Sequence, residues 1–139
     1  MITNGSIELE VSNHDFSAVI CVHHAIKLKK LAKIIMDVAD LENIEAFIFQ
    51  IKDEAGDIKE YGFENIEEGQ INGSKMTLDQ TGLQINDVFE MICFDHDFWE
   101  ISVKALAHDP THDLKDFKVL SKKGSIYAKF DEYDQEIDD

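Results

Sequence analysis

The chain has 139 residues, 44% of them hydrophobic, which is enough to close one hydrophobic core and too few for two large domains. Thirteen lysines stand against 29 acidic residues, so the formal net charge is −16, and arginine is absent from the sequence. An acidic chain without the planar guanidinium group repels phosphate backbones and reads guanine poorly, so we expect no direct contact with DNA or RNA.

The cysteines and the hydropathy of the chain indicate where the protein works. Cys21 and Cys93 lie far apart in separate apolar runs, without the close spacing of a zinc site or a redox pair, so both are expected to be buried free thiols. Residues 1–6 lack the cationic cluster and the apolar stretch of a signal peptide, and no apolar run approaches the length of a membrane span. We therefore expect a soluble protein of the cytoplasm without membrane contact.

The first forty residues predict a hairpin followed by a helix. Alternating apolar and polar residues indicate a strand over 6–11, and the apolar, β-branched run 16–22 indicates a second strand paired with it around a turn at 13–15. From residue 25 the apolar spacing becomes helical, which predicts the main amphipathic helix. The apolar stripe of this helix consists of Leu28, Leu31, Ile34, Ile35, Val38 and Leu41.

Charged residues surround the start of this helix. His23 and His24 lie where the second strand gives way to the helix, and no good N-cap residue separates the two elements. A lysine cluster on the helix could form a patch for an anionic ligand. Lysines on the exposed side of an amphipathic helix are ordinarily a solvated face, and we prefer that interpretation. The cluster consists of Lys27, Lys29, Lys30 and Lys33.

The rest of the chain predicts more strands and short helical turns. Thr77 and Gln80 have the spacing of a capping box, and Gly82 can end that turn of helix at once. The Asp109-Pro110 pair has the pattern of a helix start, so a short helix or a turn is expected after it. Turn residues separate the apolar runs, which favours hairpins. The remaining strands are expected over 44–51, 58–63, 88–94, 99–107, 117–120 and 125–130.

These elements predict an α+β fold: an antiparallel β-sheet built of hairpins, with one main amphipathic helix and one or two short helices packed on it. Residues 1–130 are expected to form a single domain, since no linker or repeat divides them, and the last hairpin is expected to turn at 122–124. Residues 131–139 carry six acidic side chains, a composition that predicts a mobile acidic tail.

Four histidines directly precede an aspartate, a pairing that can supply metal ligands or an acid and a base. All four pairs fall in expected turns, where aspartate is common because it bonds its own backbone, and that is the preferred interpretation. The sequence contains no glycine-rich phosphate loop, no Gly-x-Ser-x-Gly elbow and no cysteine with an evident histidine partner, so we assign no cofactor and no catalytic residue. The candidate metal ligands are Asp95, His96, Asp97, His108 and His112.

A longer motif resembles a known family. The run 77–89, followed by Phe94, Asp95, Asp97, Trp99, Glu100 and Val103, resembles the plasmid pRiA4b open-reading-frame-three-like family, whose members carry a leucine-rich turn, a strand and a Tyr-Asp-Phe-Gly-Asp-x-Trp-x-His type of motif. Aligned on Trp99, the chain keeps Asp97 and Glu100 and departs from the motif at His96 and Ile101. The resemblance covers roughly residues 6–107. It implies an α+β domain with an antiparallel sheet, in a family without an established biochemical role.

This motif marks Asp97, Trp99 and Glu100 as candidate binding residues. Trp99 is the only tryptophan and could be a platform for a stacked ligand, but a core residue is the preferred interpretation because large aromatic side chains dominate small cores. Since no catalytic constellation is visible, the leading hypothesis is a non-catalytic binding or interaction domain. We expect a protein partner, which could be basic.

Two alternative functions follow from the charge and from the histidines. The charge of −16 and the acidic tail fit a mimic of nucleic acid that inhibits a basic nucleic-acid-binding protein. The histidine-aspartate pairs fit a small metal-dependent hydrolase that uses Asp95, His96 and Asp97, together with His108 or His112. The sequence favours binding over catalysis and does not determine the oligomeric state.

Overall fold

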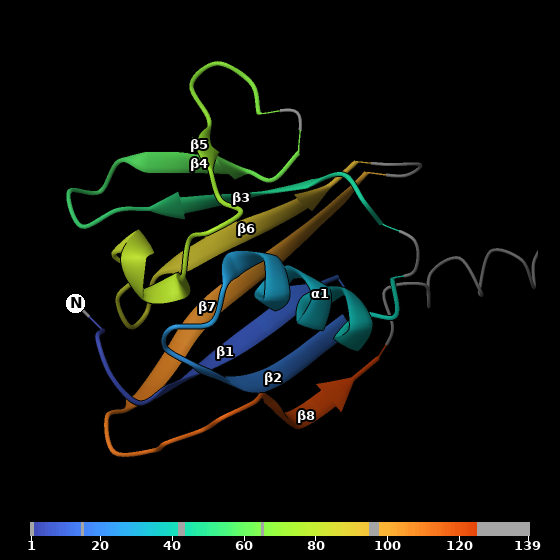
Figure 1. The fold of residues 1–139 in the computed structure, drawn as a ribbon. Helices are drawn as coiled ribbons and strands as arrows, with labels where there is room; N and C mark the ends of the chain where they lie inside the picture. The colour runs from blue at the N-terminus through green and yellow to red at the C-terminus, as the bar shows by residue number, and fades with distance from the viewer. Residues whose placement is uncertain (1, 15, 42–43, 65, 95–97, 125–139) are drawn as a thin grey trace, which may run out of the picture.

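The computed structural model describes residues 2–14, 16–41, 44–64, 66–94 and 98–124, and the structural statements below concern these residues. They form two layers, an eight-stranded sheet and one α-helix that lies across a face of it (Figure 1). The helices are α1 (Leu28–Val38) and the 3₁₀ helix η1 (Leu78–Thr81). The strands are β1 (Ser6–Asn13), β2 (Phe16–His23), β3 (Phe47–Lys52), β4 (Ile58–Gly62), β5 (Ile71–Asn72), β6 (Val88–Cys93), β7 (Trp99–Asp109) and β8 (Lys118–Lys123).

The strands lie in the order β5-β4-β3-β6-β7-β1-β2-β8. Neighbouring strands are antiparallel, except that β4 and β5 are parallel. This sheet confirms the predicted α+β class, and the predicted hairpins appear as β1–β2, β3–β4 and β6–β7. Because β1 lies between β7 and β2, and β8 adds to β2, only β2 separates the first described strand from the last (Figure 1).

The end of the described chain differs in part from the prediction. After Asp109 the chain forms a turn, one of the two predicted alternatives, because the Asp109 carboxylate accepts hydrogen bonds from the backbone N–H and the hydroxyl of Thr111, at 3.0 and 2.8 Å. The residues predicted as the last hairpin turn, Lys122 and Lys123, belong to β8, since this strand stays paired with β2 as far as Lys123. The predicted strand 125–130 and the acidic tail 131–139 lie outside the described residues.

The core lies between α1 and the covered face of the sheet. The apolar stripe predicted for the helix is buried there, and Leu28, Leu31 and Ile35 have no exposed surface. Burial of each such side chain contributes about 1.5–3 kcal/mol. The helix begins without a side-chain cap, as predicted for this junction. Instead the Leu28 N–H donates to the Met76 carbonyl oxygen at 2.9 Å, so the loop before η1 satisfies it.

η1 confirms the predicted capping box. Thr77 and Gln80 each accept a hydrogen bond from the backbone N–H of the other, and Gly82 ends the turn with a φ of 81°. His24 Nδ1 lies 2.9 Å from Asp79 Oδ2, which ties η1 to the junction between β2 and α1. These contacts hold the loops around η1 beside the N-terminal end of α1.

The opposite face of the sheet carries no helix in the described part of the chain. It presents the polar residues of the alternating strands, and four glutamates on it come from β1, β6 and β7. The predicted burial of both cysteines as free thiols is confirmed. No described helix is long and apolar enough to cross a membrane. The four glutamates are Glu8, Glu10, Glu90 and Glu100.

Candidate functional site

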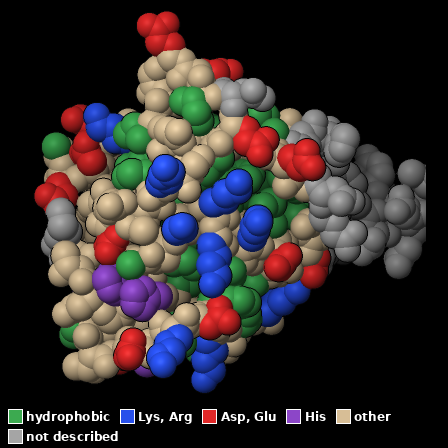
Figure 2. Space-filling model, in the orientation of Figure 1, with side chains coloured by type: hydrophobic (Ala, Val, Ile, Leu, Met, Phe, Trp, Pro, Cys, Tyr) green, Lys and Arg blue, Asp and Glu red, His purple; other side chains and the backbone are tan. Residues whose placement is uncertain are grey.

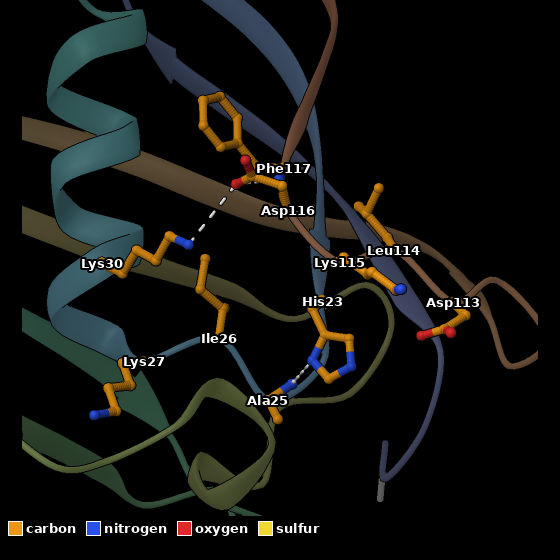
Figure 3. Close-up of a pocket in the computed structure, with 10 residues that line it drawn as sticks. All are labelled: His23, Ala25, Ile26, Lys27, Lys30, Asp113, Leu114, Lys115, Asp116 and Phe117. Atoms are coloured by element: carbon orange, nitrogen blue, oxygen red, sulfur yellow. Dashed lines mark hydrogen bonds and ion pairs between the residues drawn. The ribbon is translucent and has the colours of Figure 1, made fainter.

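A pocket of about 410 Å³ lies where the end of β2, the first turns of α1 and the connection between β7 and β8 meet (Figure 3). We call it the α1 pocket. One wall consists of His23, residues 25–27 and Lys30, and the other consists of residues 113–117. The two walls are distant in the sequence, and the pairing of β8 with β2 brings them together.

The wall at the β2–α1 junction is shaped by short-range hydrogen bonds. β2 ends at His23, whose Nδ1 accepts a hydrogen bond from the Ala25 N–H at 3.1 Å. The carbonyl oxygen of His23 accepts a second one from the Ile26 N–H, also at 3.1 Å. This tight reversal places the Ile26 side chain between Lys30 and His23 at the centre of the pocket wall (Figure 3).

The second wall is positioned by the turn after β7 and by one ion pair. Hydrogen bonds from the Thr111 side chain and backbone to Asp109 hold the pKa of that carboxyl below its ordinary value of 3.8. Across the pocket, Lys30 Nζ lies 3.7 Å from Asp116 Oδ1 (Figure 3). Both partners are more than half exposed, so this pair stabilises the wall by at most about 1 kcal/mol and can open at little cost.

The base of the pocket is apolar and open to solvent. Ile26 is buried, Leu114 is half-buried and Phe117 is 39% exposed. An exposed phenylalanine beside a buried isoleucine offers a place for another apolar side chain, because covering both removes apolar surface from water. This base therefore suits a ligand with an apolar group.

The rim of the pocket is charged. It carries the exposed side chains of three lysines, Lys27, Lys30 and Lys115, and of two aspartates, Asp113 and Asp116. One carboxylate is already paired with Lys30, which leaves a local excess of ammonium groups. Carboxylates of a ligand would meet this excess directly.

Positive charge continues from the pocket along the helix. Figure 2 views the molecule from the side of α1 and shows lysines gathered over the helix. Four exposed lysines come from α1 and the residue before it, and we call them the α1 lysine face: Lys27, Lys29, Lys30 and Lys33. Because the chain carries a net −16, this face is a local reversal of the overall sign, which favours an anionic partner there.

Sequence reasoning noticed the lysines but missed the pocket. The lysines were interpreted as a solvated face, and nothing in the helix pattern itself shows that residues 113–117 lie opposite them. A usable signal was present in Leu114 and Phe117, two large apolar residues inside a charged stretch without strand alternation. In the structure both side chains line the pocket, where a ligand or partner could cover them.

The candidate binding residues from the family motif lie elsewhere. Trp99 is 9% exposed and belongs to the core, as preferred, although it also lines a pocket of about 390 Å³ on the uncovered face of the sheet together with His14 and Glu100. Glu100 is exposed, and its carbonyl oxygen accepts a hydrogen bond from Asn13 Nδ2 at 2.6 Å. Asp97 lies outside the described residues.

Of the candidate metal ligands, the structure describes His108 and His112. His108 and His112 line a pocket of about 180 Å³ with Ser6 and Cys21, where His108 Nε2 contacts the Asn4 carbonyl oxygen at 2.7 Å and His112 Nδ1 contacts Ser6 Oγ at 2.8 Å. Asp95, His96 and Asp97 lie outside the described residues. Phe98, which follows them, precedes β7, so about 30 Å of strand separates it from His108. Within the described residues no three histidine, cysteine, aspartate or glutamate side chains are grouped to hold a metal.

The fold and the pocket define an α+β domain with a large sheet, a single covering α-helix and a cationic, partly apolar pocket at the start of that helix, in the part of the chain described. No family model and no curated protein matches the chain. The chain is similar to the crystal structure of a protein of unknown function, MM3350 from Methanosarcina mazei Go1, with a TM-score of 0.76 and 16% sequence identity. The match covers 99% of this chain and 84% of that one, and it supports the fold alone. The resemblance to the pRiA4b open-reading-frame-three-like family stays a prediction.

Proposed function

We propose that this chain is a non-catalytic binding domain whose α1 pocket takes an acidic protein segment that carries an apolar side chain. The observation behind the proposal is the open apolar base of the pocket with three lysines at its rim. The apolar side chain of the partner would pack between Ile26 and Phe117. Its flanking carboxylates would face Lys27, Lys30 and Lys115.

The strength of such a complex follows from these contacts. Burial of one apolar side chain contributes about 1.5–3 kcal/mol, and each exposed ion pair adds about 0.2–1 kcal/mol. Ordering the peptide and the lysine side chains offsets part of this gain. We therefore expect a weak, reversible complex with a Kd of about 10 μM to 1 mM, which weakens as salt screens the charges.

Fluorescence anisotropy with labelled peptides tests the proposal. The probe is a peptide of about twelve residues, rich in aspartate and glutamate, with one central phenylalanine. Two matched peptides replace the phenylalanine by alanine or all acids by lysine. We expect the probe to bind, the alanine peptide to bind several-fold more weakly, and the affinity to fall as ionic strength rises from about 0.01 to 0.15 M, where the Debye length shortens from about 30 to 8 Å.

Charge reversal at the pocket gives the sharper comparison. Lys30→Glu removes one ion pair with the probe and adds a repulsion, so the affinity should fall by about 1 kcal/mol, which is about fivefold. Lys52→Glu is the matched control: it makes the same charge change at an exposed position of β3, about four strand spacings, or 19 Å, from β2. Equal losses in both variants would mean that net charge alone governs binding, and the α1 pocket would be rejected as the site.

The acidic mimic of nucleic acid is a second proposal, supported by the glutamates of the uncovered sheet face. Glu8, Glu10, Glu90 and Glu100 lie on that face, opposite α1. A basic partner would meet them there, although Lys104 stands directly across from Glu10 in the sheet. In the same assay this function predicts that the lysine peptide binds, and that Lys30→Glu does not weaken it.

A further inference from the structure

We infer that the uncovered face of the sheet carries a second binding site, a pocket for the guanidinium group of an arginine side chain in a partner protein. This site is the pocket of about 390 Å³ that Trp99 lines, and we call it the sheet pocket. It shares no lining residue with the α1 pocket, so the inference does not rest on the function proposed there. Six of its lining residues provide the contacts: Ser12, Glu90, Phe98, Trp99, Glu100 and Ser102.

Three neighbouring strands supply a row of oxygen atoms to the sheet pocket. In the register of the sheet, Ser102 of β7 stands opposite Glu90 of β6 on one side and opposite Ser12 of β1 on the other. Neighbouring strands lie about 4.8 Å apart, so the row places one carboxylate and two hydroxyls along about 10 Å of the face. All three groups can accept hydrogen bonds, which suits a ligand with several N–H donors.

A second carboxylate lies beside this row. Glu100 is two residues from Ser102 along β7, so it points to the same face and is a diagonal neighbour of Glu90, at about 7–8 Å between their backbones. Among the residues that the structure describes, neither carboxylate takes part in an ion pair and no lysine lines the sheet pocket. A cation bound between the two carboxylates would relieve their mutual repulsion.

An exposed aromatic ring distinguishes the kind of cation. Phe98 lines the sheet pocket and is 65% exposed. A guanidinium group is planar and weakly hydrated, so it can stack on such a ring while its N–H groups donate to carboxylates. A lysine ammonium is more strongly hydrated and lacks this planar fork. The combination of an exposed ring with several acceptors therefore favours arginine over lysine.

The sheet pocket is held in shape by a contact between β1 and β7. The Asn13 side-chain N–H donates to the Glu100 carbonyl oxygen at 2.6 Å, which ties the end of β1 to the start of β7. Both residues line the pocket. Because this bond joins the backbone of one strand to a side chain of the next, the pocket walls are positioned before a ligand binds.

The composition of the chain indicates where the guanidinium group comes from. The sequence contains no arginine, so neither this chain nor a second copy of it can supply the group. The net charge of −16 attracts basic proteins from solution. The partner is therefore a different, basic protein that presents an arginine at its surface.

NMR titration of the full, ¹⁵N-labelled chain tests the inference. The probe is a glycine-serine peptide with blocked ends and one central arginine, and a matched peptide carries lysine in its place. Trp99 is the only tryptophan and lines the sheet pocket, so its indole N–H signal reports binding at that site. We expect the arginine peptide to shift this signal and the backbone amides of Glu90, Glu100 and Ser102 saturably, and the lysine peptide to bind about three- to tenfold more weakly.

Two double variants separate the sheet pocket from the charge of the whole face. Glu90→Gln with Glu100→Gln should weaken the arginine peptide about three- to tenfold. Glu8→Gln with Glu10→Gln is the matched control, because it changes the net charge equally on the same face at residues that do not line the sheet pocket. We expect the control to weaken binding by less than about twofold.

A third variant tests the aromatic ring. Phe98→Leu keeps an apolar side chain at an exposed position and removes the surface on which a guanidinium stacks. We expect this variant to bind the arginine and lysine peptides with nearly equal affinity. An arginine preference that persists in Phe98→Leu would overturn the assignment of a guanidinium site.

The remaining outcomes separate this inference from the other proposals. Equal losses in the two double variants would overturn the sheet pocket and leave the acidic mimic standing, since that function needs only the charge of the face. Equal binding of the two peptides by the unaltered chain would also overturn it. Binding of the acidic phenylalanine peptide at the α1 pocket is measured separately, so its failure leaves the sheet pocket standing.

Shifts confined to the α1 pocket, such as the Ile26 amide, would place the arginine peptide elsewhere and overturn the inference.

Discussion

Replacing Gly5 by alanine tests how closely the backbone before β1 packs against the end of β7. Gly5 has a φ of +72°, and a Cβ atom on it would lie 1.9 Å from the Asp109 carbonyl oxygen and 2.6 Å from Pro110 Cα. Both neighbours are backbone atoms, so no side-chain rotation relieves the overlap. The next residue, Ser6, is buried and contacts His112, so displacement here also disturbs the pocket at this end of β7.

The expected loss combines two terms. An L-residue in the left-handed region costs about 1–2 kcal/mol relative to glycine, and displacing packed backbone adds about 1–3 kcal/mol. Gly5→Ala should therefore lower the free energy of unfolding by about 2–5 kcal/mol, a large part of the stability of a small domain. Gly56→Ala is the matched control, because Gly56 has a φ of +87° with no atom within 4 Å of the added Cβ. It should lose only the conformational term of about 1–2 kcal/mol.

Urea unfolding measures both losses. Trp99 is the only tryptophan and is 9% exposed, so its fluorescence reports the transition. Each midpoint should fall without a change in the slope of free energy against urea, since the same surface is exposed on unfolding. If Gly5→Ala were no less stable than Gly56→Ala, the result would contradict the close packing of residue 5 against residue 109 and of the start of β1 against the end of β7.

Three further predictions concern ionisation and thiol access. Burial, and then the nearby Asp53 carboxylate, raise the pKa of the Tyr61 hydroxyl above 10.0. Because this hydroxyl ionises at a lower pH in the unfolded chain, the free energy of unfolding should fall as pH rises past 10.0. Urea midpoints measured across that range should fall less steeply with pH in Tyr61→Phe. Thr111→Val removes the hydroxyl that lowers the pKa of the Asp109 carboxyl, so an NMR titration should show that pKa rising toward 3.8. The stability that this lowered pKa gives the folded chain is present above pH 3.8 and is lost as pH falls through the folded pKa. The two buried cysteines should react with a thiol reagent slowly in the native chain and rapidly in urea, and fast native reaction would contradict their burial.

Local patterns were sufficient for most elements of the fold. The alternation along 6–11 and the helical spacing from Leu28 to Val38 each identify a buried face, and the structure places those faces in one core. The capping box at Thr77 could be predicted from the sequence because it depends on two residues only three positions apart. The residue at which β8 ends could not be predicted from the sequence, because Lys122 and Lys123 continue as a strand only through their pairing with β2.

The candidate site was much less accessible to sequence reasoning than the fold. The lysines of α1 were visible, but the pocket exists only because residues 113–117 lie across from Ile26 and Lys30. Conversely, His108 and His112 were candidate metal ligands because each precedes an aspartate, whereas each ring has its own hydrogen-bonding partner in the described structure. Proximity of titratable residues in the sequence is a poor guide when a turn lies between them.

By itself, the sequence determined the α+β class, the amphipathic helix, the buried thiols and the acidic charge, because each depends on composition or on side chains within one element. Only the tertiary structure decided the strand order and the α1 pocket with its apolar base and lysine rim. The physical reason is that the pocket is made by two segments almost ninety residues apart, Ile26 and residues 113–117, joined through the β2–β8 pairing. No local propensity encodes that contact, because it depends on which strands pair in the sheet.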